Sequence, residues 1–210
     1  MKEDKENMTH EHARQIPQIY ERHAQAWDSD RRRGIWNDRS WHDRFIACLS
    51  SGARVLDLGC GSGIPVAFHL VQHGLRVTGV DTSPTLIALC RQRMPEHEWI
   101  IAEMQTLALP QRFDGLVSWD SFFHLTLGQQ RTMFSVFAAH ATPGAFLLFN
   151  TGAEQGESLG SYQGEPLYHA SLNAEEYQQL LDRSGFGVIA HTVADPTAGG
   201  RTIWLAQSRK

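Results

Sequence analysis

Short apolar runs alternate along the chain with stretches whose apolar residues are spaced as on one face of a helix. Five such runs predict buried β-strands, at residues 55–58, 75–80, 99–102, 113–119 and 145–150. The helical spacing between them predicts three helices: Ile64–Gly74, one that begins at Pro84 with Ser83 as its cap, and Arg131–Ala139. Because strands and helices alternate, the pattern predicts an α/β fold with a parallel sheet.

The N-terminal part of the chain lacks this alternation. Residues 1 to about 14 are polar, and we expect them to be solvated and disordered. The spacing of apolar residues predicts one helix over 16–27 and another over 36–49. Both precede the first strand, so we expect a helical cap over residues 1–49 that lies outside the sheet repeat.

The C-terminal part combines a long polar stretch with a further helix. Residues 151–171 are polar and rich in glycine, and they form a longer connection than is usual in compact domains. We therefore expect a loop there that acts as a functional lid. Asn173 is predicted to cap a helix that runs to Arg183 and is ended by Gly185.

Two final strands complete the predicted sheet. They cover residues 186–194 and 201–207, and the short turn between them forces them to run antiparallel. The predicted fold is a doubly wound, seven-stranded, mostly parallel sheet with an antiparallel hairpin at the C-terminus. We expect a single domain over residues 1–210, whose core spans 50–208.

Composition and charge argue against several classes of function. The chain of 210 residues has a formal net charge of −4, whereas general nucleic-acid binders carry a basic excess. No apolar run approaches the ~20 residues that span a membrane. The N-terminus lacks the apolar segment of a signal peptide, and the three cysteines show no metal spacing. We therefore expect a cytoplasmic protein that binds neither nucleic acid nor membrane.

A glycine turn follows the first strand, at Gly59, Gly61 and Gly63. Glycines suit a sharp reversal at which a ligand approaches the bare backbone. The third glycine comes one residue too early for the G-x-G-x-x-G dinucleotide fingerprint, and the Lys-Ser/Thr pair of a Walker loop is absent. Asp57 at the mouth of the turn would oppose a pyrophosphate, but it would suit an ammonium or a sulfonium. S-adenosyl-L-methionine is a ligand of that class.

The segment Asp57-Leu58-Gly59-Cys60-Gly61-Ser62-Gly63 resembles the first motif of class I S-adenosylmethionine-dependent methyltransferases. Asp81, about 20 residues further on, matches the acid that holds the ribose hydroxyls, and Glu103-Met104 matches the adenine-binding position. The resemblance covers about residues 50–208 and implies a Rossmann-like fold, the cofactor S-adenosyl-L-methionine and the product S-adenosyl-L-homocysteine. In this family, N-terminal segments fold over the cofactor, and an aromatic pair such as Tyr20 and Trp27 often reaches its methionine part. The cofactor residues that it implies are Asp57, Gly59, Cys60, Gly61, Gly63, Ile64, Asp81, Thr82, Ser83, Glu103, Met104, Trp119, Tyr20 and Trp27.

The end of the fourth strand carries the substrate information in this family. The sequence Asp120-Ser121-Phe122-Phe123-His124-Leu125 stands there, in place of the Asn/Asp-Pro-Pro-Tyr tetrad of enzymes that methylate the amino groups of bases. The resemblance therefore implies transfer of a methyl group to a small molecule. His124 is the first candidate catalytic residue, because a histidine titrates near neutral pH. Asp120 is a second candidate. The candidate substrate residues are Phe123, His124, Tyr168 and His169.

Other readings of the sequence stay open at this point. An arginine of the run Arg31-Arg32-Arg33 is either solvated or binds a carboxylate of the cofactor or of an acidic substrate. The protein could also bind the cofactor without transferase activity, as a sensor or partner subunit. A nicotinamide-dependent oxidoreductase is disfavoured by the position of Gly63.

Two further patterns are set aside. Gly156-Glu157-Ser158-Leu159-Gly160 fits the nucleophile motif of hydrolases, but its flanks are predicted to be loop. His69 and His73 have a spacing that metals use, but no third acidic or thiol ligand accompanies them in the sequence. They are expected to be surface residues of a helix, and no metal is predicted.

Overall fold

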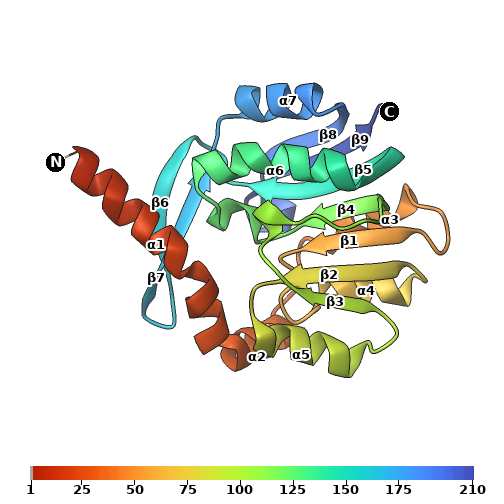
Figure 1. Cartoon of the computed structure of the whole chain (residues 1–210), viewed down its shortest axis with the longest axis horizontal. Coiled ribbons are helices and arrows are strands. Elements are labelled where there is room, and N and C mark those ends of the chain that lie inside the picture. The colour runs from red at the N-terminus through yellow and green to blue at the C-terminus, as the bar shows by residue number, and fades with distance from the viewer. Residues whose placement is uncertain (1) are drawn as a thin grey trace.

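A seven-stranded sheet forms the centre of the computed structural model, which describes the backbone of residues 2–210 and the side chains of residues 11–210 (Figure 1). The strand order is β3-β2-β1-β4-β5-β9-β8. Within this sheet β9 runs in the direction opposite to the other strands. The order reverses between β1 and β4, as in doubly wound sheets. The strands are β1 Arg54–Leu58, β2 Arg76–Asp81, β3 Glu98–Ile101, β4 Phe113–Ser118, β5 Ala141–Thr151, β8 Phe186–Asp195 and β9 Arg201–Ser208. The predicted seven-stranded sheet is confirmed.

Helices cover both faces of the sheet, because successive side chains of a strand point to opposite faces. In β1, Val55 packs in a core with α3, α4 and α5, whereas Leu56 packs in a second core with α6 and α7. These helices are α3 Arg39–Ala47, α4 Val66–Gln72, α5 Pro84–Arg93, α6 Leu127–His140 and α7 Ala174–Arg183. The predicted caps are confirmed at Ser83, which accepts from the backbone N–H of Leu86, and at Asn173, which accepts from that of Glu176.

The N-terminal cap differs from its prediction in two ways. The expected helix over 16–27 is two helices, α1 Lys2–Arg22 and α2 Ala24–Arg33, which meet at His23. The expectation of disorder up to about residue 14 is wrong for the described part, since α1 begins at Lys2; Met1 lies outside the described residues. In Figure 1, α1 lies beside β7, and the two elements are in contact.

The prediction that residues 151–171 form a loop is also wrong. The segment forms a hairpin of β6 Gly156–Tyr162 and β7 Glu165–Ser171, paired antiparallel in a separate two-stranded sheet. Its turn is the two-residue segment Gln163-Gly164, and both residues have positive φ angles, 51° and 82°. Such a turn matches the twist of a hairpin. The buried side chains of β7 pack against α1, which explains why so polar a segment is ordered.

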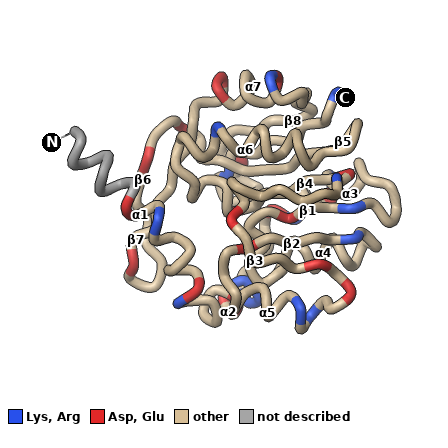
Figure 2. The backbone as a smooth tube through the Cα atoms, in the orientation of Figure 1, with Lys and Arg blue, Asp and Glu red and all other residues tan. Residues whose placement is uncertain are grey.

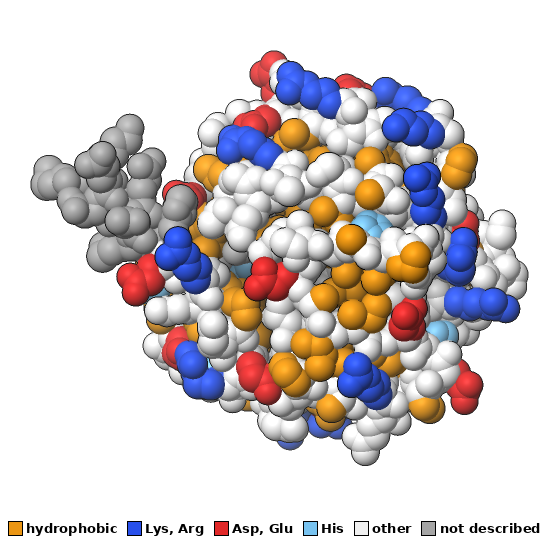
Figure 3. Space-filling view, in the orientation of Figure 1, with side chains coloured by type: hydrophobic (Ala, Val, Ile, Leu, Met, Phe, Trp, Pro, Cys, Tyr) orange, Lys and Arg blue, Asp and Glu red, His pale blue; other side chains and the backbone are white. Residues whose placement is uncertain are grey.

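Charges of both signs are interspersed along the chain (Figure 2). On the face shown in Figure 3, apolar side chains gather in the middle, and most charged side chains lie towards the margin. No helix in the described part of the chain is long and apolar enough to cross a membrane.

Candidate active site

The glycine turn between β1 and α4 is held tightly against β2. The backbone N–H groups of Gly59 and Cys60 both donate to the carbonyl of Val80, at 2.8 and 3.0 Å. Gly59 has a φ of 78°, and a Cβ there would lie 2.3 Å from the Cβ of Ser121. Because an L side chain fits neither that φ nor that space, this position requires glycine.

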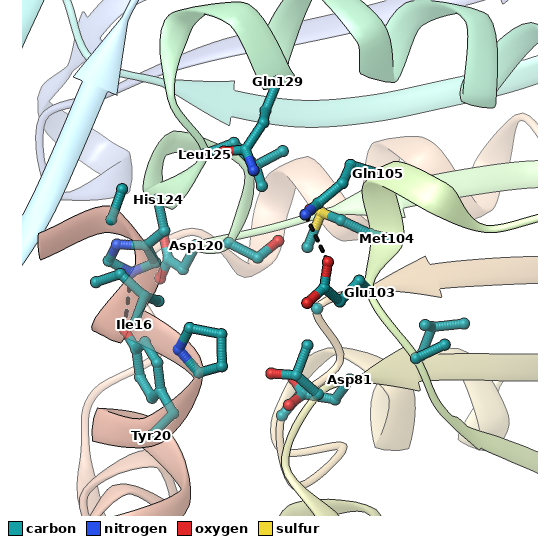
Figure 4. Close-up of a pocket in the computed structure, with 18 of the residues that line it drawn as sticks. Ile16, Tyr20, Asp81, Glu103, Met104, Gln105, Asp120, His124, Leu125 and Gln129 are labelled. Atoms are coloured by element: carbon teal, nitrogen blue, oxygen red, sulfur yellow. Dashed lines mark hydrogen bonds between the residues drawn. The ribbon is translucent and has the colours of Figure 1, made fainter. Parts of the chain in front are cut away.

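A cavity of about 550 Å³ opens beside this turn, at the carboxyl ends of the parallel strands. Its size is typical of small-molecule sites, and its position is where open α/β sheets bind their ligands. In Figure 4, Asp81 and Glu103 face Tyr20 and His124 across it. The predicted residues that line this cavity are Tyr20, Trp27, Gly59, Gly61, Asp81, Thr82, Glu103, Met104, Asp120 and His124.

Asp81 is fixed in place by the backbone. One carboxylate oxygen accepts from the N–H of Gly61 and the other from the N–H of Ser83, both at 2.9 Å. Burial raises the pKa of Asp81, while these N–H groups favour its charged form. Each oxygen keeps a further lone pair, so the carboxylate can still accept hydrogen bonds from a diol.

Asp57, the carboxylate of the first motif, has an oxygen without a hydrogen-bond partner among the described residues. The side chain is buried, and this oxygen is Oδ2. Burial, followed by the charge of Asp81, raises the pKa of Asp57 to about 7. A buried polar atom without a partner is costly. Asp57 faces a small cavity of about 40 Å³, which it shares with Trp36 and Trp119, and an ammonium placed there would supply the missing partner.

Several predicted cofactor residues fall elsewhere. Cys60, Ile64 and Trp119 line the small cavity with Asp57. Gly63 and Ser83 line neither cavity, and each has a structural role instead. A Cβ on Gly63 would meet Met94 at 2.6 Å, while Ser83 caps α5 and donates to Glu21 of α1.

His124 has both ring nitrogens occupied. Its Nδ1 donates to the backbone carbonyl of Tyr168 at 2.7 Å, so its Nε2 accepts from the hydroxyl of Tyr20 at 2.8 Å. Burial lowers the pKa of His124 to about 4, and the ring is therefore neutral at physiological pH. This histidine joins α1 to β7 and positions the hydroxyl of Tyr20.

Asp120 is saturated with hydrogen bonds. Arg201 donates to both of its carboxylate oxygens at 2.7 Å, Arg31 donates to Oδ2 at 2.7 Å, and Asn150 donates to Oδ1 at 2.9 Å. Burial opposes the charge, but the two guanidinium groups outweigh it and hold the pKa of Asp120 well below its usual value. Asp120 thereby joins α2 of the cap to β9. Of the three arginines in the run, Arg31 is thus paired with a carboxylate of the protein itself.

A second, more open cavity of about 460 Å³ adjoins the first one. The two share Tyr20, Trp27, Asp120 and His124 as a common wall. The predicted substrate residues Phe123 and His169 line the second cavity, whereas the ring of Tyr168 is buried and its hydroxyl donates to Glu157. Leu167 and Arg201 line it as well and were not predicted as substrate residues. Arg31, which belongs to the run that was considered for an acidic substrate, also lines it.

The predictions that His69 and His73 are surface residues and that no third ligand accompanies them are both wrong in part. His69 is buried, with 4% of its surface exposed, and is not a surface residue. A third acidic group does accompany the pair, because α3 brings Asp43 next to them. The hydrolase-like motif at 156–160 lies within β6, without the helix that a nucleophile elbow needs.

The chain resembles methyltransferases in its sequence. Residues 55–144 match the family model of a methyltransferase domain. Trans-aconitate 2-methyltransferase of Paracidovorax citrulli is 34% identical over 101 residues, which cover 47% of this chain and 38% of that protein. Ubiquinone biosynthesis O-methyltransferase of Stutzerimonas stutzeri is 26% identical over 150 residues, which cover 69% of this chain and 59% of that protein. The chain spans less than two thirds of the length of these relatives.

Solved structures share the fold. A 1,6-didemethyltoxoflavin-N1-methyltransferase of Burkholderia thailandensis, with S-adenosylhomocysteine bound, aligns over 96% of this chain and 90% of its own, with a TM-score of 0.70 and 20% identity. An amino pentose methyltransferase of Micromonospora echinaspora, with S-adenosylmethionine bound, aligns over 87% of this chain and 95% of its own, with a TM-score of 0.67 and 20% identity. At this identity the likeness concerns the fold. The chain thus has the fold of these methyltransferases, and its residues 55–144, which include the glycine turn, match a methyltransferase domain.

Proposed function

We propose that this protein transfers a methyl group from S-adenosyl-L-methionine to a small-molecule acceptor. One observation carries the proposal: a cofactor-sized cavity and a second cavity share a single wall. A protein that only bound the cofactor would have no use for the second space. In a transferase, the two reactants must lie side by side in a fixed orientation.

The chain offers a partner for each part of the cofactor. Glu103 and Met104 suit the adenine, by hydrogen bonding and packing, and the carboxylate of Asp81 suits the ribose diol. Asp57, with its free oxygen, suits the ammonium of the methionine part. When bound, the cofactor supplies an already activated methyl group on its sulfonium, so the protein needs only to align the acceptor, exclude water and accept a proton where the acceptor carries one.

Arg201 lies 3.7 Å from Asp38, a carboxylate outside the lining of the acceptor cavity. The lining itself contains two guanidinium groups, Arg31 and Arg201, and one carboxylate, Asp120. Acceptors that carry an acidic group are therefore the first class to test. Replacing Arg31 with Met should raise the KM of an acidic acceptor more than that of a neutral one.

The pair of Tyr20 and His124 supports the wall between the cavities. We expect Tyr20→Phe and His124→Gln to lower kcat/KM by similar factors, about fivefold each, because one hydrogen bond contributes about 1 kcal/mol. The double variant should be little worse than either single variant, since both remove the same contact. Steady-state kinetics of the three variants checks this expectation. If His124 were instead the general base, His124→Gln would abolish turnover while Tyr20→Phe retained most of it.

Cofactor affinity should depend on pH through Asp57. The ammonium needs the charged carboxylate, but the pKa of Asp57 is raised to about 7 before the ligand binds. Binding below that pH must release a proton, so the affinity for S-adenosylhomocysteine should fall about tenfold for each pH unit below about 7. Calorimetry between about pH 5.5 and pH 7.5 measures it. An affinity that stays constant over this range would contradict the assignment of Asp57 to the ammonium.

A transfer assay with labelled S-adenosylmethionine and a panel of small molecules tests the function as a whole. Label should appear on at least one acceptor, and acidic compounds should be the first to respond. Tight cofactor binding without transfer to any compound would favour the sensor or partner-subunit alternative. Binding of NAD in preference to S-adenosylmethionine would favour the oxidoreductase.

We further propose that residues 1–210 act as one domain, in which the cap over 1–49 closes the cavity of the core. The contacts of α1 with β7 and α5 support this proposal. A cytoplasmic location fits the three cysteines, all of which are free thiols in the described chain.

A further inference from the structure

Three metal-ligating side chains meet outside both cavities, between α3 and α4. They are Asp43 of α3, His69 of α4 and His73 at the end of α4, and their ligand atoms all lie within 4.8 Å of one another. Asp43 Oδ1 lies 2.6 Å from His69 Nε2, and the two imidazole rings have centroids 4.3 Å apart. None of the three residues lines the proposed cofactor or acceptor cavity.

The local backbone prepares this arrangement. The N–H of His73 donates to the carbonyl of His69 at 3.2 Å, so the chain is still helical at His73 and the two rings lie on one face. Nδ1 of His73 also donates to that carbonyl, at 2.8 Å. The proton is thereby fixed on Nδ1, and the lone pair of Nε2 is left for a ligand. Metal-binding histidines usually hold their second nitrogen in this way.

We propose that Asp43, His69 and His73 form a binding site for a divalent transition-metal ion, with zinc as its representative. Two imidazoles and one carboxylate suit zinc, cobalt or nickel, whereas magnesium and calcium prefer oxygen ligands. Three protein ligands leave a further position for water. Asp43 is about half exposed and lies on the surface with His73, so both side chains can move the short distance that coordination needs. Arg39 approaches the other oxygen of Asp43, at 3.5 Å, and is the one cation among the described side chains that would compete.

The site connects physically to the small cavity that Asp57 lines. The ring of His69 packs edge-on against Trp36, with centroids 4.8 Å apart, and Trp36 lines the small cavity that holds Asp57. A metal bound here would join α3 to α4 and so fix the surroundings of Trp36. By linkage, metal and cofactor should then each change the affinity of the other by the same factor.

Zinc binding to the full chain, stripped by a chelator and dialysed, tests the proposal. Calorimetry should show one zinc ion per chain at this site, and zinc should raise the melting temperature while magnesium should not. His73→Gln and Asp43→Asn should each weaken zinc binding by at least about tenfold, since loss of even a supporting group costs about that much. His73→Cys should retain binding, because a thiolate also ligates zinc.

Asp182→Asn is the matched control. Asp182 is a carboxylate with 45% of its side chain exposed, against 47% for Asp43, and it too pairs with an arginine. This variant should bind zinc as the wild type does. The proposal is overturned if the wild type takes up no stoichiometric zinc, or if His73→Gln binds zinc as tightly as the wild type. Neither result depends on whether the protein transfers methyl groups.

Discussion

Replacing Asp57 with Asn is expected to weaken the binding of S-adenosylhomocysteine strongly while it stabilises the free protein. Loss of one partner from a buried charge pair costs about 2 kcal/mol or more, so the Kd should rise at least about 30-fold. The variant keeps the size of the side chain and removes only its charge. Calorimetry gives the affinity, and urea denaturation gives the free energy of unfolding.

The gain in stability follows from the raised pKa. A carboxyl whose folded pKa of about 7 exceeds its unfolded value near 4 contributes stability that is present below about pH 4 and is lost as the pH rises to 7. Asn cannot ionise, so the variant should avoid this loss and be more stable than the wild type by about 1–3 kcal/mol at pH 8. A variant that is less stable than the wild type, yet binds the cofactor equally well, would show that Asp57 is a structural residue.

Replacing Asp120 with Asn is expected to destabilise the fold. The change leaves Arg31 and Arg201 side by side without their shared carboxylate. Breaking a buried ion pair costs several kcal/mol, and because both arginines are 27% exposed we expect a smaller loss, of about 2–3 kcal/mol. Asn tolerates the positive φ of 50° at this position, so the loss reports the charge rather than backbone strain.

Urea denaturation of Asp120→Asn and of Asp182→Asn measures the difference. The surface pair of Asp182 and Arg209 is exposed to solvent and should contribute little, so Asp182→Asn should unfold at nearly the same urea concentration as the wild type. Cofactor affinity should fall together with stability in Asp120→Asn, because α2 loses its attachment to β9. If Asp120 were instead the catalytic base, the variant would lose turnover at unchanged stability and unchanged cofactor affinity.

The part of the proposed cofactor cavity that the glycine turn and β2 form was predictable, because these segments are local in sequence. The turn needs glycines at positions of positive φ, and the two acids lie at the carboxyl ends of strands: Asp57 is the penultimate residue of β1, and Asp81 is the last residue of β2. The carboxyl ends of parallel strands meet at one edge, so the two acids had to lie close together. The caps at Ser83 and Asn173 were predictable for the same reason.

The ion pair and the hydrogen bond that build the wall of the second cavity were not predictable, because they join distant segments. Asp120 and Arg201 are 81 positions apart, and Tyr20 and His124 are 104 apart. No local sequence pattern predicts either pair. The β6–β7 hairpin was missed for a different reason: its strands are polar on the outside, and its Gln163-Gly164 turn is a weaker signal than Asn-Gly or Asp-Gly.

The most direct test of the account is a crystal structure of the wild-type chain grown with S-adenosylhomocysteine. It should show the adenine beside Glu103 and Met104, the ribose diol on Asp81, and the amino group within hydrogen-bond distance of Asp57 Oδ2. An empty cavity at that edge of the sheet, with the ligand bound elsewhere or not at all, would contradict the assignment.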